Sequence, residues 1–181
     1  MIADNGNLKK ILLVEDDRRD VELSLRALEK LHLSDRVVVA RDGEEALDYL
    51  FFRGEFKNRP GGDPVVVLLD NKMPKIGGLE VLKIIRADEH LQMLPVVVFS
   101  SSREKNDLLK FYKHGVNAYV MKPLDFTEFV NAIQQLGTFW ATVNEPPPVT
   151  PGEADGVRNP GAVPLEKAAD RILAPSTASL E

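Results

Sequence analysis

The chain has 181 residues, of which 44% are hydrophobic and 28% are charged, and its formal net charge is −5. These proportions are those of a soluble globular protein with one domain and an appendage. The chain has no cysteine, which excludes disulfides, thiolate metal sites and cysteine nucleophiles. No apolar run approaches the roughly 20 residues that span a bilayer, and the negative charge does not favour nucleic acid. We therefore expect a cytoplasmic protein without DNA or membrane partners.

Five short apolar segments predict β-strands. The run at 65–69 is the clearest, because apolar residues without a polar break are typical of a strand that is buried on both faces. The other four segments lie at 11–14, 37–40, 96–99 and 118–121. Helical apolar patterns separate the strands, and candidate helix starts are marked by Asp17, Asp42, Ser101 and Asp125. This alternation predicts a doubly wound α/β fold, a five-stranded parallel sheet for which the strand order 2-1-3-4-5 is suitable.

The composition divides the chain into a folded domain over 1–140 and an arm over 141–181. From residue 145 to residue 164 there are six prolines and three glycines, which predicts an extended linker. A short helical pattern follows near 165–173. The connection at 53–64, before the third strand, contains turn residues without periodicity, and we expect it to be a flexible loop.

Polar side chains follow four of the predicted strands. Glu15 and Asp16 follow the first, Asp70 the third, Ser100 the fourth and Lys122 the fifth. The carboxyl ends of parallel strands lie at one edge of a sheet, where ligands bind. Clustered carboxylates repel one another unless a cation intervenes, and oxygen ligands of this kind suit Mg²⁺. A carboxylate nucleophile beside a metal, a hydroxyl and an ammonium group matches phosphoryl transfer.

Each of these residues also has a simpler interpretation. Glu15 and Asp16 can cap the first helix, as Asp17 is expected to do, and Asp70 and Ser100 are residue types common in turns. Lys122 can be an ordinary solvated lysine. Their occurrence at the same end of successive strands favours a shared site.

The motifs Ile11–Asp17, Leu68–Asp70 with Met73, Pro74 and Gly78, Phe99–Ser101 and Tyr119–Pro123 stand in the order and spacing of a known family. Over residues 9–140 the chain resembles the receiver domain of two-component response regulators, which implies a flavodoxin-like fold. The resemblance implies that a histidine kinase phosphorylates Asp70, and that Mg²⁺ is held by Glu15, Asp16, Asp70 and the backbone carbonyl of Lys72. It further implies a switch hydroxyl at Ser100, a phosphate-contacting Lys122, a rotating Tyr119 and a cis peptide bond between Lys122 and Pro123.

Within this family, the chain most resembles the stand-alone receivers that are paired with phytochrome-type histidine kinases. These kinases include the bacteriophytochromes. The features that carry this resemblance are the connection containing Arg59 and Pro60 and the lack of a folded output domain. Gly77 stands where many receivers have Asp, and we expect no effect of this difference on the phosphate. Onward relay to a histidine phosphotransfer protein is left open. We expect a phosphoacceptor that catalyses its own phosphorylation rather than an enzyme.

Three other functions fit the sequence less well. A phosphatase of the haloacid dehalogenase type needs a second Asp two residues after the first, where this chain has Lys72. A phosphorylation-independent dimeric adaptor is the main alternative, although the intact set of site residues argues against it. A DNA-binding regulator needs a further folded domain, and the segment after Trp140 is too short and too rich in proline.

The arm predicts a homodimer, because its few apolar residues cannot form a core of their own. The available anchors are Trp140, Leu165, Ile172 and Leu173. An extended arm of about twenty residues reaches some 60 Å at most, enough to cross a neighbouring domain. We expect each arm to pack on the partner, with a central contact through the fourth helix, the fifth strand and the fifth helix. On that surface we expect Leu108, Phe111 and Tyr112. The alternative is an arm that folds back on its own domain.

Overall fold

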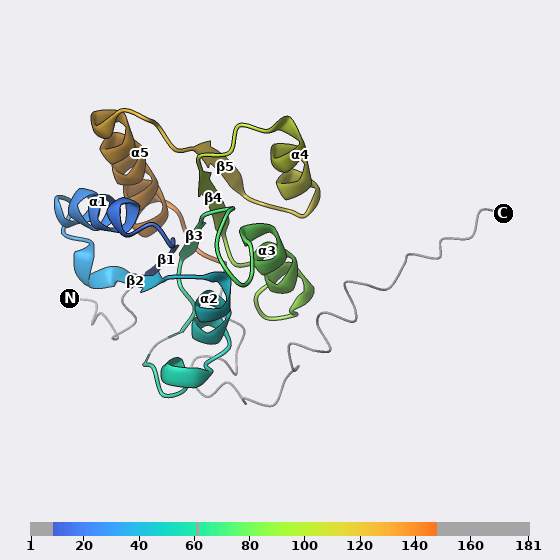
Figure 1. The fold of residues 1–181 in the computed structure, drawn as a ribbon. Coiled ribbons are helices and arrows are strands. Elements are labelled where there is room, and N and C mark those ends of the chain that lie inside the picture. Colours follow the sequence, from blue (N-terminus) through green and yellow to red (C-terminus); the bar gives the residue numbers. More distant parts are fainter. Residues whose placement is uncertain (1–8, 61, 148–181) are drawn as a thin grey trace.

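The computed structural model describes residues 9–60 and 62–147 (Figure 1). Its single sheet has five parallel strands in the order β2-β1-β3-β4-β5, which confirms the predicted topology. The strands are β1 (Ile11–Val14), β2 (Val37–Ala40), β3 (Val66–Leu69), β4 (Val96–Ser100) and β5 (Ala118–Met121). Within residues 9–60 and 62–147, no helix has the length and apolar character that a membrane span requires.

Five α-helices alternate with the strands as predicted. They are α1 (Arg18–Glu29), α2 (Gly43–Leu50), α3 (Gly78–Ala87), α4 (Lys105–Lys113) and α5 (Phe126–Thr138). The side chains of Asp17, Asp42 and Asp125 accept hydrogen bonds from backbone N–H groups at the starts of α1, α2 and α5. These three predicted caps are therefore confirmed. The predicted start at Ser101 is wrong, because α4 begins only after Glu104.

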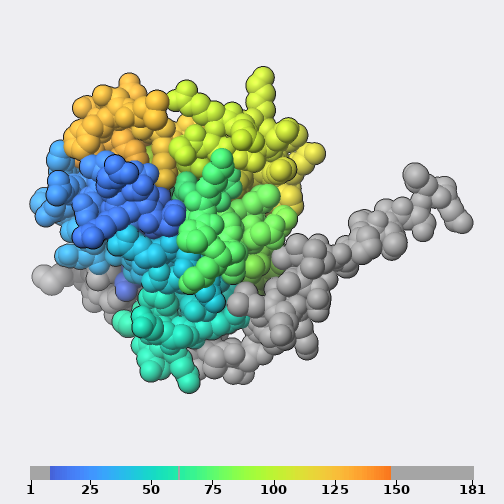
Figure 2. All heavy atoms as spheres, viewed as in Figure 1, coloured from blue at the N-terminus to red at the C-terminus, as the bar shows by residue number. Residues whose placement is uncertain are grey.

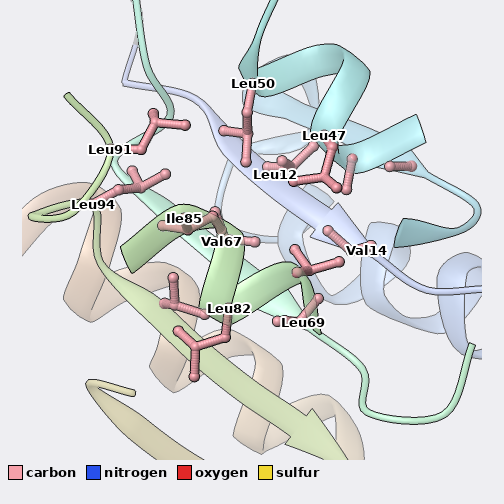
Figure 3. Packing of buried hydrophobic residues seen from close by; sticks show 14 of the residues in the cluster. Leu12, Val14, Leu47, Leu50, Val67, Leu69, Leu82, Ile85, Leu91 and Leu94 are labelled. Atoms are coloured by element: carbon pink, nitrogen blue, oxygen red, sulfur yellow. The ribbon is translucent and has the colours of Figure 1, made fainter. Parts of the chain in front are cut away.

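The helices cover the sheet in two layers. Figure 1 shows α1 and α5 side by side on one face, and α2, α3 and α4 on the other. Consecutive strand residues point to opposite faces, so Leu12 and Val14 enter one core while Ile11 and Leu13 enter the other. Figure 3 shows the core beneath α2 and α3, where side chains of both helices meet those of β1 and β3. Burial on both faces fixes the strands and so fixes where their carboxyl ends lie.

The connection before β3 is packed on α2, in contrast to the flexible loop that we expected. The guanidinium of Arg59 lies 4.0 Å from the ring centroid of Tyr49 and 3.7 Å from that of Phe52. Its Nε donates a 2.9 Å hydrogen bond to the Tyr49 carbonyl, and Tyr49 also meets Phe56 edge to face. These contacts anchor the connection at several points.

The end of α5 continues as a π-helical turn, Phe139–Val143. Trp140 is half-buried, packs against the core beneath α1 and α5, and meets the ring of Phe139 edge to face. Trp140 is therefore held by its own domain. The predicted helix near 165–173 and the anchors Leu165, Ile172 and Leu173 lie outside the described residues, so the exchange of arms stays a prediction.

Candidate functional site

The predicted site residues come together at the carboxyl edge of the sheet. The parallel register aligns Val14 with Leu69 and Ser100 with Met121, so the residues that follow these strands lie at one edge. Figure 2 shows the corresponding surface, where the blue segment of α1 borders the green segment that follows β3. The strand pairing alone thus accounts for the meeting of residues far apart in the chain.

Three carboxylates form the acidic part of the site. Ligand oxygens of Glu15, Asp16 and Asp70 lie within 4.8 Å of one another. Glu15 is 3% exposed and Asp70 6% exposed, whereas Asp16 faces solvent. Two buried carboxylates and one open to solvent form a site that an ion can enter from one side.

The ammonium group of Lys122 lies among these carboxylates. Its Nζ is 2.5 Å from Glu15 Oε2, 2.9 Å from Asp20 Oδ2 and 3.3 Å from Asp70 Oδ1. Asp20 is a partner of Lys122 that the sequence interpretation missed. It lies in the first turn of α1, and no local pattern in the sequence marks its pairing with Lys122.

Burial and charge shift the pKa values of this cluster. Burial raises the pKa of Glu15 to about 7, although its hydrogen bond and charge interaction with Lys122 oppose the shift. Burial lowers the pKa of Lys122, but hydrogen bonds to Glu15 and Asp20 outweigh it and leave the pKa above its ordinary value. At neutral pH Lys122 is therefore charged, while Glu15 lies near the midpoint of its titration.

One oxygen of the Asp70 carboxylate accepts a hydrogen bond, and the other accepts none from the described residues. Its Oδ2 accepts a 3.0 Å hydrogen bond from the backbone N–H of Lys72. Its Oδ1 is buried and receives no hydrogen bond from the described residues, because the Lys122 Nζ lies nearby without suitable hydrogen-bond geometry. A buried oxygen without a donor, in a set of oxygen ligands, fits a hard divalent cation such as Mg²⁺. The Lys72 carbonyl as a further ligand stays a prediction.

Ser100 and Tyr119 both contact the loop between β4 and α4. Ser100 is buried, and its Oγ accepts a 3.3 Å hydrogen bond from the backbone N–H of Ser102. The hydroxyl of Tyr119 donates a 3.2 Å hydrogen bond to the Ser102 carbonyl, and its ring meets that of Phe111 edge to face at 5.6 Å. Burial raises the pKa of Tyr119, so its phenol stays protonated and remains a donor.

Asp107 links the site to α4. Its Oδ2 accepts a 2.7 Å hydrogen bond from Ser102 Oγ and a 3.1 Å hydrogen bond from Asn71 Nδ2. Asn71 directly follows Asp70 in the chain. One carboxylate oxygen thus joins the loop after β3, the loop after β4 and the first turn of α4. The sequence interpretation did not find this link.

The prediction of a cis bond between Lys122 and Pro123 is wrong for this structure. The structure has no cis peptide bond among the described residues. The backbone N–H of Lys122 donates a 2.9 Å hydrogen bond to the Ser100 carbonyl, which continues the pairing of β5 with β4. From this position the long Lys122 side chain reaches Asp70 without a cis turn.

The predicted dimer surface is exposed in part. Leu108 and Tyr112 of α4 are 39% and 53% exposed. Phe111, which we expected on the same surface, is buried and contacts Tyr119, so it belongs to the core. Packing explains the difference, because the ring of Phe111 is held against Tyr119 while the side chains of Leu108 and Tyr112 remain exposed.

These features are those of one protein family. The family model of the response regulator receiver domain matches residues 11–134, and the chain belongs to this family. Among curated proteins, it is 34% identical to the response regulator Rcp1 of Synechocystis sp. over 77% of this chain and 94% of Rcp1.

Three solved structures show the same likeness. The phosphorylated cyanobacterial phytochrome response regulator RcpA is 36% identical, with a TM-score of 0.72 over 77% of this chain and 99% of RcpA. The bacteriophytochrome response regulator AtBRR is 59% identical, with a TM-score of 0.62 over 77% of this chain and 99% of AtBRR. A structure of Rcp1 is also known in its Mn²⁺-bound form, at 33% identity and a TM-score of 0.70 over 77% of this chain and 99% of Rcp1.

Proposed function

We propose that the protein accepts a phosphoryl group from a histidine kinase on Asp70 and transmits the change through protein contacts. The observation that carries this proposal is the buried Asp70 carboxylate, with one oxygen lacking a donor, between two further carboxylates and the ammonium group of Lys122. In the reaction an Asp70 oxygen attacks phosphorus, the phosphorus–nitrogen bond of the phosphohistidine breaks, and the imidazole leaves with the electron pair of that bond. The protein is then a phosphoacceptor rather than an enzyme that turns over a separate substrate.

The acidic cluster is proposed to hold Mg²⁺. Glu15, Asp16 and Asp70 would hold the ion, which supplies positive charge where the transferred phosphoryl oxygens approach. The Mn²⁺-bound form of Rcp1 supports a divalent ion in this family. Lys122 contributes a second positive charge, and Ser100 a hydroxyl donor, on the protein side of the phosphoryl group.

The partner kinase is proposed to be of the phytochrome type. The relatives named as phytochrome or bacteriophytochrome response regulators support this choice, since AtBRR is 59% identical to this chain.

Phosphorylation is proposed to change the loop after β4. The Ser100 hydroxyl now accepts a hydrogen bond from the Ser102 N–H, so turning it towards a phosphoryl group on Asp70 would break that bond. Tyr119 is held by the same Ser102 through its carbonyl, so its anchor would move with the loop. The surface that changes would then be α4 and β5.

A homodimer is proposed through α4, β5 and α5, with exchanged C-terminal arms. The support is apolar side chains left exposed on α4 and β5, because Leu108 is 39%, Tyr112 53% and Met121 54% exposed. Truncation after residue 147 removes residues 148–181 of the arm and keeps every residue that the structure describes. Light scattering at several concentrations should then show a weaker dimer than that of the full chain. An unchanged dimer would refute the exchange of arms.

The phosphoacceptor is tested with a small phosphodonor and with the kinase. Wild-type protein should incorporate acid-stable, base-labile phosphate in the presence of Mg²⁺, and Asp70→Asn should incorporate none. Asp35→Asn is the matched control, because Asp35 is exposed and precedes β2 at the opposite edge of the sheet. Phosphate incorporation by Asp70→Asn at the wild-type rate would refute the assignment of Asp70, whereas a wild type that takes up no phosphate would favour the phosphorylation-independent adaptor.

A further inference from the structure

We propose that Asp20 is a positioning residue for Lys122, and that it holds the ammonium group beside Asp70 when a divalent cation takes the carboxylate of Glu15. The inference rests on the proposed function, which it deepens by adding a residue outside the ion-binding set.

Lys122 has carboxylate partners of two kinds. Its Nζ lies 2.5 Å from Glu15 Oε2, and Glu15 shares the acidic cluster with Asp16 and Asp70. It also lies 2.9 Å from Asp20 Oδ2, and Asp20 does not belong to that cluster. The Lys122 side chain is only 9% exposed, so its charge depends on these partners rather than on water.

A bound cation would change how strongly Lys122 interacts with Glu15 relative to Asp20. The cation and Lys122 are both positive, and both need the oxygens of Glu15. When the cation takes them, the hydrogen bond between Lys122 and Glu15 is weakened and the ammonium group is repelled. Asp20 is then the carboxylate partner of Lys122 that stays available among the described residues. It keeps Nζ near Asp70 Oδ1, from which it lies 3.3 Å.

The start of α1 makes Asp20 a fixed partner. The side chain of Asp17 caps the helix, and its Oδ1 accepts hydrogen bonds from the N–H groups of Arg19, at 2.7 Å, and Asp20, at 3.3 Å. The backbone of Asp20 is thus tied to the residue that follows Asp16. The segment that presents a cation ligand also presents the partner of Lys122.

A simpler explanation is an ion pair of little consequence, since Asp20 is 29% exposed and exposed pairs contribute little. A second one is a general effect of negative charge on cation binding. The first explanation predicts that removal of the Asp20 charge has little effect, and the second predicts an effect that does not depend on Lys122. Our proposal predicts that it acts through Lys122.

The test combines Asp20→Asn with Lys122→Met in a double-mutant cycle on the full chain. One readout is the initial rate of phosphorylation by phosphoramidate at saturating Mg²⁺, and the other is the dissociation constant for Mg²⁺ measured by calorimetry. Glu22→Gln is the matched control, because Glu22 lies on the same helix and pairs only with exposed Arg18 among the described residues. Asp20→Glu tests rescue, and thermal melts confirm that each variant is folded.

We expect Asp20→Asn to lower the phosphorylation rate about tenfold and to weaken Mg²⁺ binding about threefold, as Lys122 returns to Glu15. In the Lys122→Met background both effects should fall below about twofold, and Asp20→Glu should recover most of the rate. Equal effects in the two backgrounds, or a rate for Asp20→Asn equal to that of Glu22→Gln, would overturn the proposal. If the wild type takes no phosphoryl group at all, the proposed function fails, while the calorimetric cycle still decides the role of Asp20.

Discussion

Replacing Glu15 by Gln should remove a pH dependence from the stability of the metal-free protein. Burial raises the pKa of Glu15 from 4.5 to about 7, so the folded protein binds a proton that the unfolded chain has already released. A raised pKa in the folded state means that stability is highest below pH 4.5. It falls as the pH rises through 7, because the folded protein must then bury a charge.

The magnitude follows from the two pKa values. Between pH 5.5 and pH 8.0, Glu15 passes from mostly protonated to mostly ionised in the fold, while it is ionised throughout in the unfolded chain. Linkage of the two titrations lowers the free energy of unfolding by about 2 kcal/mol over this pH interval. For a domain of this size, that corresponds to a fall in the melting temperature of about 4–8 °C.

The assay is a series of thermal melts in the presence of a chelator, at several pH values, for the wild type and Glu15→Gln. The variant has no proton to lose at this position, so subtracting its curve removes the contributions of all other titrating groups. The same melts with saturating Mg²⁺ should show a wild-type gain that is larger at pH 8.0 than at pH 5.5, because ligation requires the ionised carboxylate.

Parallel curves for the two proteins would refute the reasoning, since Glu15 would then titrate alike in the folded and unfolded states. A wild-type stability that rises relative to the variant between pH 5.5 and 8.0 would refute it too. That result would mean that the pairing with Lys122 outweighs burial at Glu15.

Two further predictions concern the scaffold of the site. Gly43→Ala should destabilise the fold by about 1–3 kcal/mol in chemical denaturation, because the added Cβ would lie 2.2 Å from the Ile76 carbonyl oxygen. Gly77→Ala should lower the free energy of unfolding by less, because its added Cβ would have its nearest neighbour at 3.5 Å. Ile133→Ala should lower the free energy of unfolding by about 2–5 kcal/mol, because the side chain of Ile133 in α5 is fully buried. Leu124→Ala, at a side chain 90% exposed, should stay within about 0.5 kcal/mol of the wild type.

The sheet and the main site residues were predictable because both follow from local pattern. A buried parallel strand shows itself as an apolar run, and the polar residue after it must lie at the same edge as those of its neighbours. Glu15, Asp70 and Lys122 therefore needed no knowledge of distant contacts. The family resemblance then supplied their roles.

The features that were missed depend on how far side chains reach across the fold. Asp20 meets Lys122 only because a lysine from β5 extends over the sheet edge, and neither residue carries a local mark of the pairing. Arg59 has the composition of a loop residue, yet its guanidinium stacks on Tyr49. In α4, four apolar residues fall close together, and only packing decides that Phe111 faces the core.

The helix α4 buries little of its surface, which lowers the free energy needed to move it. Of the residues in α4, which the structure describes in full, Phe111 alone is buried, whereas α2 buries Ala46, Leu47, Tyr49 and Leu50. Local opening of α4 exposes one large buried side chain, whereas opening of α2 exposes several, so α4 has the lower opening free energy of the two. Reversing a two-state population from 1:99 to 99:1 takes about 5.5 kcal/mol. If Asp70 is phosphorylated as we propose, two or three charge-assisted hydrogen bonds to the phosphoryl group would supply energy of this size and would shift α4 before α2.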